Sequence, residues 1–591
     1  MVTSDLCESI SGDLRHCTLQ WLDLAQQTAN SWFWQNSHPL LNRDIQAMQL
    51  KRPELSSQTI IVLTSLYLLV ALNGVFVGRL LQATPDGGVG LLDVTMLAAV
   101  FVIHMLLLSV VAWPRVLKPA FVCLILIATA AAYFMQRFGA VMDRHAIASV
   151  FESDAREAGE WLNGGMMLWF LGFGVLPSAL LIWVKVRYRP FLSEAGRRIG
   201  YATAAVVLLL AVAWPQSQSL SALLRNHAEL RHFANPFSVL NSTRGYLKHE
   251  FALPEGPPAP YGRDARVVPG ADQKPILLVL VIGESARSSS FSLAGYARDT
   301  NPELQTLPLL KYMDVESCGT NTATSLPCMF SGLGQDHYDA GKARRRENLL
   351  DLFMHAGYNV RWRDNNTGSK KIAARATETD LASATHPTWC PAGSCFDEIL
   401  LENLDQDLPM PAKNTVLVLH MLGSHGPAYI ERYPREFARF TPECDSPELS
   451  TCERESILNA YDNSILYSDH VLARTIAWLE TKTAYQTAMF FASDHGESTG
   501  EHGFYLHGAP KFMAPDEQTR IPMLIWLSPD WQQAQGFDWQ CAATAPGSKL
   551  NHDWFFHTAL SLGRVQSSVY EPKLDLLKNC WNPTAMPSSQ M

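Results

Sequence analysis

The stretch KPILLVLVIGESAR, residues 274–287, decides the fold class of this chain. Its aliphatic run at residues 276–282 ends abruptly in Gly283 and Glu284. A run that is apolar at every position suits a strand buried on both faces, as in a parallel sheet. The sequence therefore predicts a buried strand with a carboxylate directly after it.

Two later segments repeat this form. NTVLVLHMLGSHGPAY (414–429) and AMFFASDHGES (488–498) are also apolar runs that break at glycine and polar residues. Helical patterns at 347–358 and 456–480 separate the runs, and strands that alternate with helices indicate an α/β sheet. Such sheets bind their ligands at the carboxyl ends of the strands. The polar residues at these three ends are Glu284, His425, Asp494 and His495.

These side chains have the chemistry of a metal site. Two carboxylates with an imidazole suit zinc or manganese, and a Ser or Thr hydroxyl that joins such a set loses its proton readily and becomes a nucleophile. Ser285 fits poorly, because Arg287 stands where a nucleophile elbow needs its last glycine. The segment SCGTNTATSLPCMF (317–330) leaves four other candidates open: Thr320, Thr322, Thr324 and Ser325.

Five apolar segments approach the roughly 20 residues that a helix needs to cross a bilayer. They lie at 59–78, 91–113, 116–135, 164–184 and 200–214, and the last is the shortest. Basic residues flank the first segment and fill the connections after the second and the fourth, whereas the connection at 143–162 is acidic. By the positive-inside rule, the acidic connection and everything after about residue 216 lie outside the cytoplasm.

Eight of the 11 cysteines fall in the part assigned to the outside. An oxidising compartment favours disulfides, and near neighbours in sequence form small closed loops. A structural zinc cluster is the alternative, but no pair has CxxC spacing. The expected disulfides are Cys318–Cys328, Cys390–Cys395, Cys444–Cys452 and, as a fourth pair, Cys541–Cys580.

Length and charge set the organisation of the chain. Its 591 residues require more than one structural unit, and a net charge of −9 argues against a nucleic-acid binder. We expect a cytoplasmic N-terminal tail at 1–57, an all-α transmembrane domain of about five helices at 58–215, a periplasmic linker at 216–270 and a catalytic α/β domain at 271–591.

Five motifs together resemble one family, the lipid A phosphoethanolamine transferases of Gram-negative bacteria, which include enzymes of polymyxin resistance. The motifs are VIGESARSSSFSLAGYARDTNP (281–302), SCGTNTATSLPCMFS (317–331), WRDNNTGSK (362–370), GSHGPAYIERYP (423–434) and SDHGESTGEHGFYLHGAP (493–510). The resemblance implies an alkaline-phosphatase-like or sulfatase-like catalytic domain in the periplasm, anchored by a multi-pass domain in the inner membrane.

The same resemblance assigns roles to individual residues. Thr322 would be the nucleophile, and a disulfide between Cys318 and Cys328 would hold it toward the metal. One tightly bound Zn²⁺, and optionally a second, is implied, and the ligands of the first would be Glu284, Thr322, Asp494 and His495. The residues around the phosphoethanolamine group or the second metal would be Asn366, Lys370, His425 and His507.

The chain departs from the family in the acidic connection. Within AIASVFESDAREA (146–158), relatives usually have an asparagine that contacts the headgroup of the donor lipid, and this chain has Ser149 there, whereas Glu157 is retained. Ser149 and Glu157 are therefore the expected headgroup contacts. The tail that precedes Ser57 is also longer than the family pattern.

The resemblance implies transfer of phosphoethanolamine from phosphatidylethanolamine to a lipid A phosphate, through a covalent threonine intermediate and among membrane lipids. Two alternatives remain open. One is a transferase that acts on another periplasmic acceptor, such as a core sugar or a glucan. The other is a sulfatase or phosphodiesterase of the same fold that passes its intermediate to water.

Overall fold

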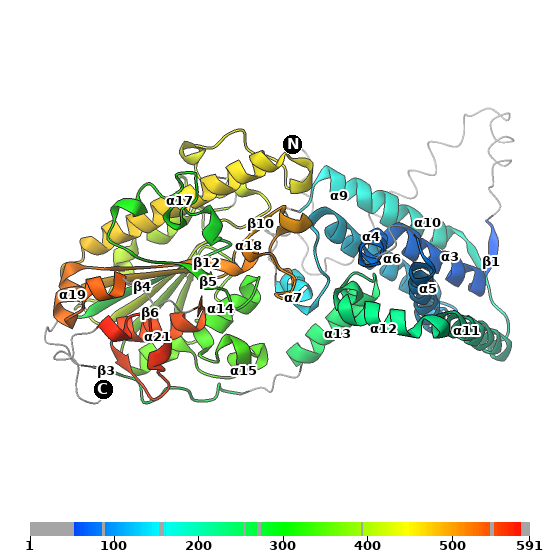
Figure 1. Cartoon of the computed structure of the whole chain (residues 1–591), viewed down its shortest axis with the longest axis horizontal. Coiled ribbons are helices and arrows are strands. Elements are labelled where there is room, and N and C mark those ends of the chain that lie inside the picture. The colour runs from blue at the N-terminus through cyan, green and yellow to red at the C-terminus, as the bar shows by residue number, and fades with distance from the viewer. Residues whose placement is uncertain are drawn as a thin grey trace, which may run out of the picture. The chain divides into compact units, whose positions relative to one another are not determined.

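The computed structural model describes residues 52–84, 89–152, 159, 161–251, 256–268, 274–391, 394–543 and 549–580. Contacts divide the chain into two units. The described part of the smaller unit contains a parallel pair of short strands, β1 (Glu54–Ser56) and β2 (Lys185–Arg187). The larger unit holds the other described helices and strands (Figure 1).

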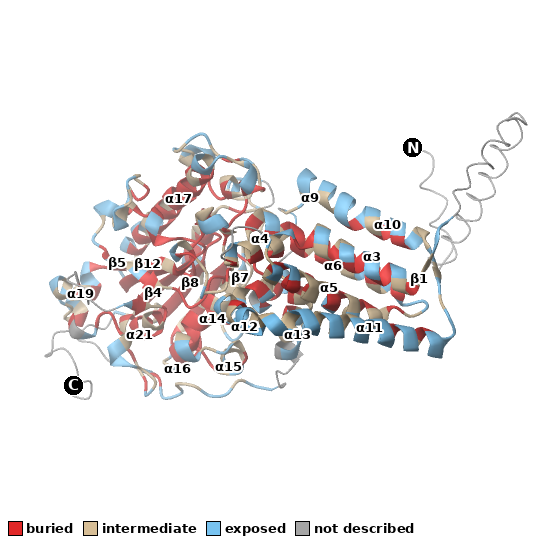
Figure 2. Ribbon diagram, turned by 45° about the vertical axis from the view of Figure 1, so that its right-hand side comes forward, coloured by how far each residue is buried: buried red, intermediate tan, exposed pale blue. Residues whose placement is uncertain are grey.

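Apolar helices form the first part of the larger unit. Four helical runs are long and apolar enough to cross a membrane: α5 (Leu91–Val111), α6 (Leu117–Phe138), the continuous run of α9 (Gly164–Trp169), η1 (Phe170–Val175) and α10 (Leu176–Trp183), and α11 (Phe191–Ala213) with its extension to Asn226. Among the described residues, a pair of helices bent by 67°, α3 (Ser57–Leu72) and α4 (Gly74–Ala83), brings the number to five if the pair counts as one span. Apolar side chains such as Leu208 and Leu210 are exposed on α11 (Figure 2), as lipid contact requires.

The span predicted at 200–214 begins earlier than the sequence indicates. Arg197 and Arg198 favour a connecting loop up to residue 200, but α11 begins at Phe191. Arg198 lies one turn after Glu194, and their buried side chains form an ion pair of 3.0 Å. This internal pairing lets the helix contain charges that would otherwise mark its end.

Helices also occupy the first part of the segment predicted as a linker at 216–270. These helices are α12 (Ser217–Asn226) and α13 (Phe237–Phe251). The Pro- and Gly-rich composition that suggested a linker begins only after α13. The linker prediction therefore fits the end of this segment, and its beginning is helical.

An eight-stranded sheet is the centre of the catalytic domain, in the order β13-β5-β12-β9-β4-β8-β6-β7. Its strands are β4 (Ile276–Gly283), β5 (Leu310–Glu316), β6 (Asn359–Asp364), β7 (Thr377–Asp380), β8 (Thr415–His420), β9 (Gln486–Ser493), β12 (Arg520–Leu527) and β13 (Leu550–Asn551). Strand β12 is antiparallel to both neighbours, and the other pairings are parallel. The three strands predicted from sequence, β9, β4 and β8, are adjacent at the centre.

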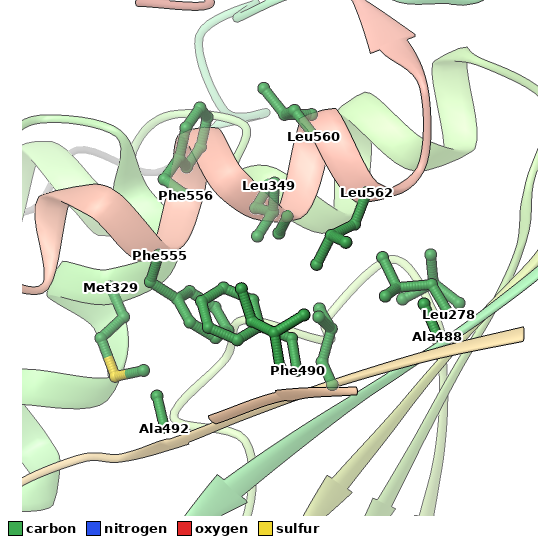
Figure 3. Close-up of a cluster of buried hydrophobic side chains, with 14 of the residues drawn as sticks. Leu278, Met329, Leu349, Ala488, Phe490, Ala492, Phe555, Phe556, Leu560 and Leu562 are labelled. Atoms are coloured by element: carbon green, nitrogen blue, oxygen red, sulfur yellow. The ribbon is translucent and has the colours of Figure 1, made fainter. Parts of the chain in front are cut away.

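Strand β4 separates two hydrophobic cores. Leu278 and Leu280 belong to one core and Leu277 and Val279 to the other, because successive side chains of a strand point to opposite faces. The first core is covered by α14 (Thr322–Ser331), α16 (Leu349–His355) and α21 (Asp553–Leu562), and Figure 3 shows side chains of α21 over the strands. The second core contains residues of α17 (Arg454–Glu480). Helices on both faces of a mostly parallel sheet confirm the predicted α/β class.

Four disulfides join the described cysteines of the catalytic domain. They are Cys318–Cys328, Cys390–Cys395, Cys444–Cys452 and Cys541–Cys580.

Candidate active site and metal centre

The register of the central strands places three polar side chains together. Gly283 of β4 pairs with Ser493 of β9, so the next residues, Glu284 and Asp494, leave the same edge of the sheet side by side. His495 follows directly. All three side chains are fully buried. A buried cluster with two carboxylates needs compensating charge or hydrogen bonds, because burial removes the stabilisation that water gives to ions.

Thr322 reaches this cluster from the start of α14. Asn321 caps the helix, since its side chain accepts a hydrogen bond from the backbone N–H of Thr324. The preceding turn is closed by the Cys318–Cys328 disulfide and by the N–H of Gly319, which donates to the Ser325 hydroxyl at 2.9 Å. Thr322 is thereby fixed as the first residue of the helix.

The Thr322 hydroxyl lies in contact with two residues of the cluster. It donates to Glu284 Oε2 at 2.9 Å, and its oxygen is 3.3 Å from His495 Nε2. His495 Nε2 is also 3.3 Å from Glu284 Oε1 and 3.3 Å from Asp494 Oδ2. The structure therefore brings the four predicted metal ligands together.

The spacing of these atoms fits a tetrahedral cation. Metal–ligand bonds of about 2.1 Å give ligand–ligand separations of about 3.4 Å in a tetrahedron, close to the 3.3 Å observed around His495 Nε2. Asp494 Oδ2 is buried and has no hydrogen-bond partner among the described residues, as expected of an atom reserved for a metal. Ligand atoms of Glu284, His495 and His507 also lie within 4.8 Å of one another, so His507 borders the same site.

Burial shapes the electrostatics of the cluster. Burial lowers the pKa of His495 to about 4 and that of His425 to about 3, which favours the neutral imidazole that metals bind. Burial together with the charge of Glu284 raises the pKa of Asp494 above its usual value. A cation between the two carboxylates would relieve this repulsion, so the charges as well as the distances suit a metal.

The predicted substrate residues lie at different distances from this cluster. Asn366 donates to Glu284 Oε2 at 2.9 Å, and the rings of His425 and His495 lie 5.2 and 4.4 Å from that of His507. The hydroxyl of Ser285 donates to Glu284 Oε1 at 2.7 Å. Lys370 is half-buried and its amino group donates to the carbonyl of Thr367 at 3.3 Å. Lys370 thus belongs to the loop of Asn366 without contacting Glu284 in this structure.

The two residues expected at the donor headgroup come from the acidic connection. Ser149 is half-buried in α7 (Arg144–Glu152), and α7 packs against α14, the helix that begins with Thr322. Glu157 lies outside the described residues.

Sequence reasoning missed three buried carboxylates near the site. Glu497 accepts from His507 Nδ1 at 2.8 Å and from the Tyr429 hydroxyl at 2.7 Å. Although burial alone would lower it, interaction with Glu497 raises the pKa of His507 to about 9. The sequence signal that could have identified Glu497 was its position, two residues after the predicted ligand His495. Asp364 and Asp397 carry no such signal, because neither lies at an end that the sequence marked as a ligand site.

Thr320, another of the four candidate hydroxyls, makes a long-range hydrogen bond. Its hydroxyl donates to the carbonyl of Ala509 at 2.6 Å. This bond ties the Thr322 turn to the loop that follows His507. It depends on tertiary structure, because the two residues are distant in sequence.

The fold and the site together define a class: a sulfatase-like or alkaline-phosphatase-like catalytic domain joined to a helical membrane domain. A family model described as "Sulfatase" matches residues 277–565, and one described as "Phosphoethanolamine transferase EptA/EptB" matches residues 100–251. Phosphoethanolamine transferase EptA of Escherichia coli strain K12 is 34% identical over 543 residues, which cover 90% of this chain and 98% of that protein. The chain belongs to the EptA/Mcr family of phosphoethanolamine transferases.

Further relatives agree across most of the chain. Phosphatidylethanolamine transferase Mcr-1 of Escherichia coli is 36% identical over 545 residues, 89% of this chain and 98% of that protein. The solved integral membrane protein lipooligosaccharide phosphoethanolamine transferase A (EptA) of Neisseria meningitidis is similar with a TM-score of 0.87 and 34% identity, and the match covers 90% of this chain and 100% of that one. This membership favours a transferase over the hydrolase alternative.

Proposed function

We propose that the chain transfers phosphoethanolamine from phosphatidylethanolamine to a lipid A phosphate, through a phosphoethanolamine–Thr322 intermediate. The observation that carries the proposal is the contact of the Thr322 hydroxyl with both Glu284 and His495 at the start of α14. The hydroxyl lies beside a carboxylate that can accept its proton, and the N-terminal end of the helix attracts anions. Both features suit the hydroxyl to attack a phosphodiester.

We assign one Zn²⁺ to Glu284, Thr322, Asp494 and His495, because nitrogen and oxygen donors at these separations suit that ion. When bound, the ion would make the Thr322 hydroxyl more acidic and offset the charge that develops on the phosphoryl oxygens. His425 and His507, whose rings are 5.2 Å apart, would be the imidazoles that hold a second ion or contact the phosphate.

The first displacement forms the intermediate. Thr322 Oγ1 forms a bond to the phosphorus of phosphatidylethanolamine while its proton passes to Glu284 Oε2, the acceptor of its hydrogen bond. The bond from phosphorus to the diacylglycerol oxygen breaks, and this oxygen takes up the proton that Glu284 received, so diacylglycerol leaves as the neutral alcohol. His507, whose Nδ1 is held by Glu497, presents its other ring nitrogen to the phosphoryl group, where a positive charge would stabilise the transition state.

The second displacement releases the product. An oxygen of the acceptor phosphate forms a bond to the phosphorus of the intermediate, and the bond from phosphorus to Thr322 Oγ1 breaks. The proton of the attacking phosphate hydroxyl passes to Glu284 and from there to the threonine oxygen, so the enzyme returns to its starting state. Asn366, anchored to Glu284, would hold the phosphoethanolamine group in line through both steps.

The proposed substrates agree with the names of relatives and with the helices. Mcr-1 is named for phosphatidylethanolamine, and a relative of 28% identity is a Kdo(2)-lipid A phosphoethanolamine transferase. Both proposed substrates are lipids, so a membrane domain with up to five spans keeps the active site beside them. We place the chain in the Gram-negative inner membrane, with residues 271–591 as the periplasmic catalytic domain and Ser149 and Glu157 near the donor headgroup.

The acceptor is tested by mass spectrometry of lipid A from cells with and without the gene. Phosphoethanolamine added to lipid A phosphate is the expected result. Modified core sugar or glucan, with unmodified lipid A, would show that the acceptor assignment is wrong.

The nucleophile is tested with purified full-length enzyme and phosphatidylethanolamine in the absence of acceptor. A phosphoethanolamine mass should appear on the peptide that contains Thr322, and Thr322→Ala should abolish both this adduct and transfer, because no other group would form the covalent bond. Ser285→Ala should slow transfer mildly and leave the adduct at Thr322. An adduct on Ser285, or near-normal transfer by Thr322→Ala, would refute the assignment.

A further inference from the structure

Two loops carry the residues proposed to contact phosphoethanolamine. The asparagine loop, residues 365–370, follows β6, and the histidine loop, residues 421–425, follows β8. Behind them lie two buried aspartates to which the reaction assigns no role, Asp364 and Asp397, each only 2% exposed.

Asp397 holds the histidine loop by its backbone. Its carboxylate accepts from the N–H of Leu422 at 2.7 Å and from the N–H of Gly423 at 2.8 Å. It also accepts from the side-chain amide of Asn365 at 2.8 Å. One carboxylate therefore binds both loops, because Asn365 begins the asparagine loop.

Asp364 fixes the asparagine loop from its other side. One oxygen accepts from the N–H groups of Asn366 and Gly368 at 2.9 and 3.0 Å. The other accepts from the indole of Trp362 at 2.7 Å and lies 2.8 Å from His420 Nδ1. These bonds hold the backbone of the asparagine loop at Asn366 and Gly368.

Both loops in turn contact Glu284. The N–H of Ser424 donates to the carbonyl of Glu284 at 3.0 Å. The amide of Asn366 donates to Glu284 Oε2 and to the carbonyl of Met421, both at 2.9 Å. A shift of either loop would therefore move Glu284 or the group that holds it.

We propose that Asp397 is a positioning residue for the transfer reaction. It acts through Asn365, Leu422 and Gly423 to fix the asparagine and histidine loops against Glu284, and so aligns Asn366 and His425 with the phosphoryl group. This inference rests on the proposed function of those residues. Misplacement of reacting groups by about 1 Å can cost on the order of 100-fold in rate, so Asp397 is expected to control kcat although it touches no substrate.

The test variant is Asp397→Asn in the full-length enzyme. Asparagine keeps the volume, but its amide nitrogen cannot accept, so at least one of the three hydrogen bonds is lost. Asp469→Asn is the matched control: Asp469 is also buried and accepts from two backbone N–H groups, those of Glu303 at 2.9 Å and Leu304 at 3.2 Å.

We expect Asp397→Asn to lower kcat about 10- to 100-fold with little change in the KM for phosphatidylethanolamine, and Asp469→Asn to stay within about twofold of the wild type. Amide hydrogen exchange should speed up at Leu422 and Gly423 in Asp397→Asn only. Unchanged kcat in Asp397→Asn, or an equal loss in Asp469→Asn at equal thermal stability, would overturn the positioning role.

Thr322→Ala is measured in parallel to separate the two proposals. If Thr322→Ala is inactive while Asp397→Asn has wild-type kcat, the positioning role alone fails. If Thr322→Ala remains active, the proposed chemistry fails whatever Asp397→Asn does.

Discussion

Gly423 lets the histidine loop lie directly against the backbone of Glu284. A Cβ at this position would sit 2.6 Å from the carbonyl oxygen of Glu284 and 3.0 Å from its nitrogen, and the backbone has a φ of +55°. Both the close approach and the left-handed conformation therefore call for glycine.

Gly423→Ala should accordingly displace Glu284 and abolish most transfer activity. Gly357→Ala is the control, because Gly357 also has a positive φ of +87° but nothing lies within 4 Å of its Cβ position. In both variants, an alanine at positive φ costs about 1 kcal/mol of stability. Only Gly423→Ala also places a Cβ too close to the backbone of Glu284. Activity assays and thermal unfolding measure the difference, and equal activity in the two variants would contradict this role of Gly423.

Glu347 joins the segment around Tyr261 to the catalytic domain. Its buried carboxylate accepts from the N–H of Tyr261 at 2.9 Å, pairs with Arg263 at 3.0 Å and lies 3.1 Å from His355 Nε2. Burial alone would raise the pKa of Glu347, but these hydrogen bonds outweigh it and lower the pKa to about 2.

Because the pKa of Glu347 is lowered on folding, its ionised form stabilises the folded state above the unfolded pKa of about 4.3, and this contribution is lost as pH falls toward the folded pKa. Glu347→Gln should therefore be clearly less stable than the wild type at neutral pH, and the difference should shrink as the pH is lowered through that window. Denaturant unfolding at several pH values measures it. Glu436→Gln, at an exposed site, should show no such trend, and a constant difference for Glu347→Gln would contradict the assignment.

At the scale of elements, a disulfide closes the turn at the start of α14, beside the proposed nucleophile Thr322. Cys318–Cys328 closes a loop of sequence separation 10, whereas Cys541–Cys580 has a separation of 39. Loop-closure entropy assigns roughly 3 kcal/mol of stability to the first and roughly 4 kcal/mol to the second.

Replacing each pair by serines should separate stability from activity. The variant without Cys541–Cys580 should lose more stability yet keep most of its transfer rate, and the variant without Cys318–Cys328 should lose less stability but most of its transfer rate, because Thr322 is no longer held toward Glu284. Unfolding and transfer assays on both double variants measure this. If the two variants lost activity in proportion to their stability, the disulfide would have no specific link to the nucleophile.

Whole-molecule behaviour should depend on the metal. A ligand that binds the folded state alone stabilises it, and here the ion would also relieve the repulsion between buried Glu284 and Asp494. Treatment with a chelator should lower the unfolding temperature and abolish transfer, and added Zn²⁺ should restore both. Metal analysis should find about one tightly bound Zn²⁺ per chain.

Variants of the ligands provide the control for metal removal. Asp494→Asn should bind less Zn²⁺ and respond little to the chelator, whereas Asp469→Asn, buried elsewhere, should respond as the wild type does. A wild-type enzyme that keeps full activity and stability in chelator would refute the metal assignment.

The sequence by itself determined the α/β class and its central strands. The apolar runs at 276–282, 416–419 and 488–492 fall in β4, β8 and β9, because strands buried on both faces are apolar at nearly every position. The sequence also identified the polar residues at the strand ends, because each apolar run stops there and polar side chains follow. The membrane helices were predictable for the same reason, although the boundary of α11 was not, because the pairing of Arg198 with Glu194 offsets their charge inside the helix.

Only the tertiary structure decided how these residues meet. The strand order β9-β4-β8 places Glu284 beside Asp494, and no local pattern encodes which strands are neighbours. The residues of 317–330 alone left Thr322 as one of four candidate hydroxyls, and the family resemblance selected it. The structure places its hydroxyl 2.9 Å from Glu284 Oε2. The positioning contacts of Asp364 and Asp397 could not be read from the sequence, because each carboxylate accepts from two backbone N–H groups, which every residue except proline carries. Their role depends on which loops lie next to them in the folded chain. Packing across the sheet determines those neighbours, and the residues adjacent in sequence do not.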